Sequence, residues 1–167
     1  GATIPHPHFQ LLAGELLTNW HRNLIRDSKI FFENNNTNYW SLLCKLTQRD
    51  QNRYLGTSGD IEWMVPFAPK ADYEIRAIFP KSNILDVAKS YLKSFSGKLT
   101  AIIHYFRKKY DISSFNFSLV GDFNNDNDDS FRVVFSLMPR QNVCENYRND
   151  FNFLGSIQST PLLHTIP

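Results

Sequence analysis

The chain has 167 residues, of which 42% are hydrophobic and 14% aromatic, so it is long and apolar enough to fold as one domain around its own core. Its 18 basic and 16 acidic residues leave a net charge of +2, which excludes a dedicated nucleic-acid binder. No apolar run approaches the roughly 20 residues that a membrane-spanning helix needs. Cys44 and Cys144 lie far apart, which excludes a disulfide framework and indicates a reducing, cytoplasmic setting.

The N-terminal segment, residues 4–12, is predicted to be a strand that starts at a sheet edge, because it contains two prolines near its start. Alternate residues of a strand project from one face, so His6, His8 and Gln10 share a side at about 7 Å per step. Burying three such polar groups is unfavourable unless each has a partner, which a phosphate, a metal or a reacting group would supply. The alternative is that the two histidines are simply exposed.

Two helices are predicted next, over residues 15–33 and 38–50, because apolar side chains recur there at three- and four-residue steps. The run 34–36, which is three asparagines, separates them. We expect His21 at the protein surface and Cys44 on a buried apolar face.

The second half of the chain, from about residue 60 to 140, predicts an antiparallel sheet packed by one long helix. Strands are expected over 61–67, 73–79, 115–120 and 131–138, and the helix from Ile84 to Tyr110. Residues 56–60 are predicted to form a turn, and residues 141–167 an irregular tail. His104 is predicted to be a structural residue beside the apolar stripe of the helix. These elements predict a single α+β domain over residues 1–167.

The segment His6-Pro7-His8-Phe9-Gln10 resembles the HPHxQ active-site motif of galactose-1-phosphate uridylyltransferases, a branch of the histidine-triad superfamily. Further along, residues 62–68 and 73–75 resemble the Val-Pro-aromatic segment and the aromatic-Glu strand of that family's second half. The likeness extends to about residue 140, so it covers most of the chain. It implies a histidine-triad-like antiparallel sheet, packed by the long helix and preceded by the N-terminal helices.

In the resembling family, the second histidine of the motif takes a nucleotidyl group from a nucleotide sugar and passes it to a sugar phosphate. The resemblance therefore implies that His8 is the nucleophile of a ping-pong cycle and that Gln10 binds the transferred phosphate. It also implies a zinc ligand at His6, with partner ligands that precede this chain, so we expect further sequence before Gly1. A homodimer and a role in galactose metabolism are implied in the same way.

Two departures from the family pattern keep alternatives open. Phe9 stands where the family usually has Gly. Some related phosphorylases also carry Phe there, so the resemblance does not fix which base and which sugar are recognised. The segment 131–136 lacks the two histidines that the family uses for a second metal, so no metal is expected there. The first alternative is a phosphorylase or hydrolase of nucleotide sugars or dinucleoside polyphosphates that uses His8. The second is a non-catalytic binding or dimerisation module.

Overall fold

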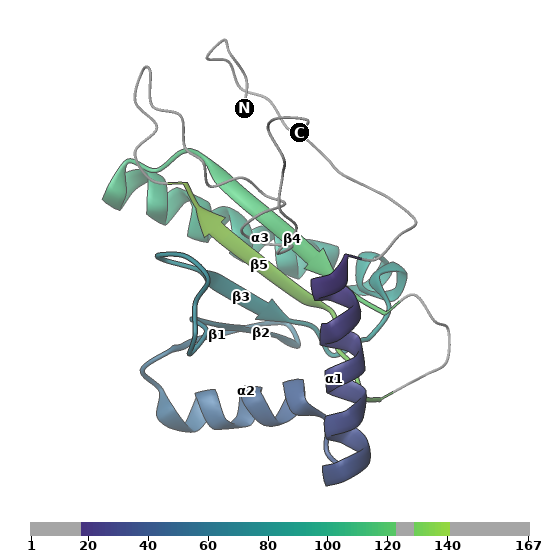
Figure 1. Ribbon diagram of the computed structural model, residues 1–167. Helices are drawn as coiled ribbons and strands as arrows, with labels where there is room; N and C mark the ends of the chain where they lie inside the picture. Colours follow the sequence, from purple (N-terminus) through teal and green to yellow (C-terminus); the bar gives the residue numbers. More distant parts are fainter. Residues whose placement is uncertain (1–17, 123–128, 141–167) are drawn as a thin grey trace, which may run out of the picture.

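The computed structural model describes residues 18–122 and 129–140. In chain order, the elements are α1 (Asn19–Asn35), α2 (Tyr39–Asp50), β1 (Tyr54–Ser58), β2 (Ile61–Met64), β3 (Ile75–Ile78), α3 (Ile84–Tyr110), β4 (Phe115–Val120) and β5 (Val134–Pro139). The strands form one antiparallel sheet in the order β1-β2-β3-β5-β4 (Figure 1). The predicted α+β class is therefore confirmed, with its long helix and N-terminal helices. None of the described helices is long and apolar enough to cross a bilayer.

Local sequence signals set the helix ends. Each helix starts after a residue whose side-chain oxygen accepts a backbone N–H of the first turn: Thr18, Asn38 and Asn83. Each ends at a residue in the left-handed conformation: Asn36, Gln51 and Asp111. Three basic residues, 107–109, occupy the last turn of α3, where they complement the helix dipole.

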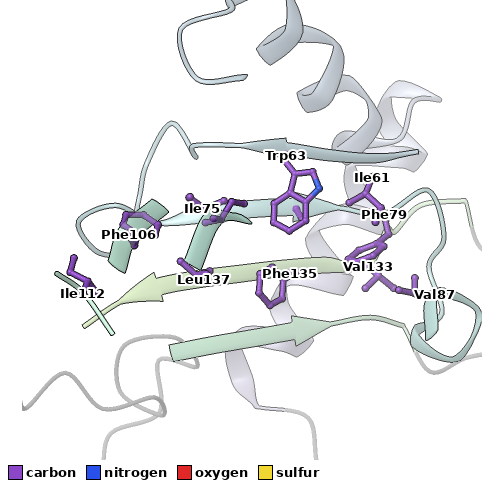
Figure 2. Packing of buried hydrophobic residues seen from close by; sticks show 12 residues of the cluster. Ile61, Trp63, Ile75, Phe79, Val87, Phe106, Ile112, Val133, Phe135 and Leu137 are labelled. Carbon is purple, nitrogen blue, oxygen red and sulfur yellow. The ribbon is translucent and has the colours of Figure 1, made fainter. Parts of the chain in front are cut away.

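One face of the sheet carries the larger core, and α3 packs against it. Figure 1 shows α3 running behind the sheet, and Figure 2 shows the buried side chains of this core, from the strands and from α3 itself. Trp63 of β2 stacks on Phe95 of α3 at 5.7 Å between ring centroids, and Phe135 of β5 meets Phe95 edge-on at 4.8 Å. These aromatic contacts fix the long helix across the central strands.

The opposite face of the sheet is covered in part by α1 and α2. A second buried cluster lies there: Trp40, Cys44, Met64, Ile78, Val120, Phe131 and Val134. Trp40 of α2 packs edge-on against Phe131 at 5.8 Å, and its indole N–H donates to Ser28 of α1 at 3.1 Å. Trp40 of α2 therefore contacts both α1 and the segment that leads into β5.

One predicted turn and three predicted strands needed correction. Residues 56–60 were expected as a turn, but Gly56–Ser58 belong to β1, and only Gly59 and Asp60 make the turn. A bulge between Tyr54 and Gly56, with Gly56 at φ +90°, interrupts the alternation that would have revealed this strand. The other strands are shorter than predicted or shifted: β2 ends at Met64, β3 starts at Ile75 and β5 starts at Val134.

Gly121 follows β4 at the point where the two cores meet. A Cβ built there would lie 2.5 Å from Cγ1 of Ile84, 3.0 Å from Cγ2 of Val133 and 3.1 Å from the carbonyl oxygen of Ser82. Two of these atoms belong to branched side chains and one to the backbone, so the crowding has no cheap relief. This glycine is required for close packing.

Replacing Gly121 by Ala is therefore expected to lower the free energy of unfolding by about 1–3 kcal/mol, through overpacking. Gly97 in the middle of α3 provides the matched control, because its Cβ would meet nothing within 4 Å. Gly97→Ala should stabilise the protein by up to about 1 kcal/mol, since Ala is the better helix former. Urea unfolding of both variants is the measurement, and equal effects of the two substitutions would contradict the packing argument.

Candidate functional site

The motif residues His6, His8 and Gln10 lie outside the described residues, so their assigned roles remain predictions from the sequence. The motif ends eight residues before Thr18, the N-cap of α1. The described part of the chain adds a second group of polar residues that the motif did not point to.

This second group begins as a polar row across three strands. Arg76 of β3 lies opposite Ser136 of β5, and Ser136 lies opposite Ser118 of β4. By strand alternation these residues share the face of Ile78, Val134 and Val120, which form the next row and are buried in the cluster under α1 and α2. Both serines are only 5% exposed. The row of Ile78, Val134 and Val120 is therefore apolar. The next row, which Met64 continues on β2, holds Arg76 and the two buried serines.

Glu74 immediately precedes β3 and is the most buried charged residue of the described chain, at 1% exposure. Its Oε1 pairs with the guanidinium of Arg76 at 3.0 Å, and its Oε2 accepts the backbone N–H of Lys70 at 2.6 Å. A buried carboxylate is tolerated only when both oxygens are satisfied in this way. Glu74 thereby ties the loop before β3 to the strand itself.

The amine of Lys70 lies over the ring of Trp20 in α1, with Nζ 3.7 Å from the ring centroid. Partial burial lowers the pKa of Lys70 to about 8; repulsion from Arg76 adds to this shift and attraction to Glu74 opposes it. Glu74 links Lys70 and Arg76, because one of its oxygens accepts the Lys70 backbone N–H and the other pairs with the guanidinium. We call these three residues, with Ser118 and Ser136, the cationic cluster.

The cationic cluster has more positive than negative charge. Of its five residues, Lys70 and Arg76 are cationic and Glu74 is acidic. Two of the cluster's buried donors, Nε of Arg76 and the hydroxyl of Ser118, have no hydrogen-bond partner. Unused donors beside surplus positive charge are what an anion requires of a protein site.

Removing the guanidinium should strongly destabilise the fold, because Glu74 would be left buried with one oxygen unpaired. Arg76→Gln is expected to cost roughly 3 kcal/mol, the low end for a broken buried pair, since the Arg76 side chain is 18% exposed. The double variant Glu74→Gln with Arg76→Gln should recover part of that loss. Chemical denaturation of the single and double variants measures this coupling, and strictly additive effects would argue against it.

His21 was expected at the surface, and the structure corrects this. It is 9% exposed, and its Nε2 lies 2.9 Å from the carbonyl oxygen of Gly121. Because a carbonyl oxygen only accepts, Nε2 carries the proton. His21 shares a helix face with Leu24 and Ser28, at steps of three and seven residues, and that spacing was the signal that could have revealed its burial.

Burial lowers the pKa of His21, opposed by the bond to Gly121 and by the charge of Asp122. The folded state therefore binds a proton less readily than the unfolded chain, whose histidine titrates near 6.5. The contribution of His21 to the free energy of unfolding is therefore complete above about pH 6.5. It is lost as the pH falls through that value toward the lowered pKa. Wild type should thus lose more stability between pH 7.5 and 5.5 than His21→Gln, which keeps an N–H donor. Identical pH profiles in urea unfolding would refute this.

An open pocket of about 350 Å³ lies between α2 and the sheet. Its lining carries as many cations as carboxylates: Lys45 and Arg132, Asp60 and Glu62. Glu62 accepts hydrogen bonds from the hydroxyl of Tyr54 at 2.7 Å and from Gln48 at 3.0 Å. Cys44, buried as predicted, also lines this pocket, and burial raises its pKa to about 12. Its thiol therefore stays protonated at neutral pH and is no nucleophile.

Two further expectations concern histidine and metal. His104 was predicted to be structural, but it is exposed on α3. The apolar stripe of the helix passes through Ile102, Ile103 and Phe106 instead. Within residues 18–122 and 129–140, no three His, Cys, Asp or Glu side chains are grouped to hold a metal ion. The described residues thus offer no ligand set for the zinc that the motif resemblance implies.

Comparison with known proteins identifies a similar sequence and a similar solved structure, each matched over about half of its length. No protein-family model matches the chain. An uncharacterized protein of Archaeoglobus fulgidus is 28% identical over 172 residues, an alignment that takes in all of this chain and 49% of that protein. A solved structure described as that of a uridylyltransferase superposes with a TM-score of 0.63 at 13% identity, over 87% of this chain and 46% of the other. The chain spans about half the length of both proteins, and the second likeness establishes a shared fold.

Proposed function

We propose that the protein is a nucleotidyltransferase that acts on nucleotide sugars and hexose 1-phosphates through a covalent intermediate on His8. The observation that carries the proposal is the motif His6-Pro7-His8-Phe9-Gln10, placed directly ahead of a domain with a uridylyltransferase-like fold. The motif is a feature of the sequence, and the fold is a likeness of structure over 87% of the chain. Galactose metabolism is the setting that the proposal favours.

The proposed reaction has two balanced steps. A neutral His8 nitrogen attacks the α-phosphorus of the nucleotide sugar, a nitrogen–phosphorus bond forms, and the bond to the hexose 1-phosphate oxygen breaks. A second hexose 1-phosphate then attacks the same phosphorus through a phosphate oxygen, and the electron pair of the nitrogen–phosphorus bond returns to His8. The histidine must be neutral at each attack, with its other nitrogen held as N–H.

Gln10 supports this chemistry from the same side of the predicted strand. Its carboxamide N–H donates to an oxygen of the transferred phosphate and stabilises the charge that develops there. His6 is assigned to zinc in this proposal, with ligands from outside the described residues. No step of the reaction passes through that metal.

The test is the intact mass of the protein, expressed from its complete reading frame, after mixing with UDP-glucose or ADP-glucose. We expect a nucleotidyl adduct whose mass identifies the base and which is absent in His8→Ala. His104→Ala is the matched control, because it removes an exposed histidine of α3 and should leave the adduct unchanged. Absence of an adduct with both sugar nucleotides would contradict the proposal, and so would an adduct that persists in His8→Ala.

A phosphorylase or hydrolase is the second candidate, and Phe9 favours it, since a bulky residue replaces the usual Gly of the motif. It uses the same His8 intermediate, so the adduct does not separate the two. Chasing the adduct with hexose 1-phosphate, inorganic phosphate or buffer alone does. Release by hexose 1-phosphate only is expected for the transferase.

A further inference from the structure

We propose that Lys70, Arg76 and Ser118 bind a phosphate group on the face of the sheet that α1 and α2 cover. The assignment of this phosphate to a substrate rests on the proposed function, whereas the site itself follows from the described residues. The phosphate belongs either to a nucleotide or to a sugar phosphate, and both present the same tetrahedral anion.

Arg76 supplies the directional donors. A guanidinium has five N–H groups in a planar fork, and here Nη2 is used on Glu74 while Nε is buried without a partner. Arginine binds phosphate oxygens in pairs through such adjacent donors. The Glu74 carboxylate holds the guanidinium in place, so Arg76 is oriented before any ligand arrives.

Lys70 supplies the second charge on the same unit. Its side chain is held over Trp20, and its backbone N–H is fixed by Glu74, so the loop that carries it has little freedom. Repulsion from Arg76 adds to the lowering of the Lys70 pKa that burial mainly causes. An anion between them would remove that repulsion and add attraction to both.

Ser118 distinguishes a ligand site from a purely structural ion pair. Its hydroxyl is buried and unpartnered, which disfavours the unliganded fold by roughly 1–3 kcal/mol. Two residues further along β4, on the same face, the chain has Val120, so an apolar side chain fits on this face. A hydroxyl in the row of Arg76 gains a partner once a phosphate oxygen lies there.

Isothermal titration calorimetry with inorganic phosphate, UDP and glucose 1-phosphate tests the site. Lys70→Gln should weaken phosphate binding at least about tenfold, the effect of losing one charged hydrogen-bond partner. Arg76→Lys keeps a cation for Glu74 but loses the fork, and it should weaken binding to a similar extent. The matched control is Lys89→Gln, an exposed cation on α3 at the opposite face of the sheet, with no expected change.

Ser118→Ala gives a readout that a structural role would not produce. We expect it to weaken phosphate binding about fivefold or more while leaving unliganded stability unchanged or higher. Tighter binding of UDP than of glucose 1-phosphate would assign the site to the nucleotide, and the reverse order to the sugar phosphate. No binding of any of the three, or equal affinities in Lys70→Gln and Lys89→Gln, would overturn the site.

The same titration in His8→Ala separates this inference from the proposed function. Phosphate binding there should match wild type, because the site contains no motif residue. If the nucleotidyl adduct is absent yet phosphate binds and responds to Lys70→Gln, the site stands and the transferase proposal fails. If the adduct forms but the affinity for phosphate is the same in Lys70→Gln and Arg76→Lys as in wild type, the transferase proposal is supported and the phosphate site is refuted.

Discussion

The pairing of β3 with β5 is the constraint on which the rest of the structure depends. Ala77 opposite Phe135 faces α3, whereas Arg76 opposite Ser136 faces the other side. A slip of one residue in this register would bring the arginine into the aromatic core and expose the core residues on the polar face. The register is therefore set by the aromatic packing on one side, and it positions the cationic cluster on the other.

Glu74 converts that register into a defined polar arrangement. As a buried carboxylate it must be satisfied on both oxygens, and it achieves this with one strand residue and one loop amide. The loop residue Lys70 then lies against Trp20, which belongs to the first turn of α1. A single buried charge thus connects the sheet, the loop before β3 and the helix that follows the histidine motif in the sequence.

The elements with strong periodicity were predictable, and the polar cluster was not. The expected limits of the long helix and of the strand 115–120 match α3 and β4, because each has an uninterrupted apolar pattern. β1 was missed because a bulge breaks its alternation. The burial of His21 was missed because a polar residue on a helix is ordinarily expected at the surface. Lys70 and Arg76 carried no signal of their own, because Glu74 links them only in the folded loop and strand. Arg76 shares a row with Ser118 only through strand pairing.

The most direct test of this account is anomalous diffraction from crystals of the protein soaked in tungstate, a heavy analogue of phosphate. The account predicts an anomalous peak within hydrogen-bonding distance of the Arg76 guanidinium and the Lys70 amine, on the side of the sheet that carries Ser118. A map in which the Glu74–Arg76 pair is intact but no peak lies on that face would contradict it. The cluster would then be a structural ion pair, and the substrate phosphate would have to bind elsewhere.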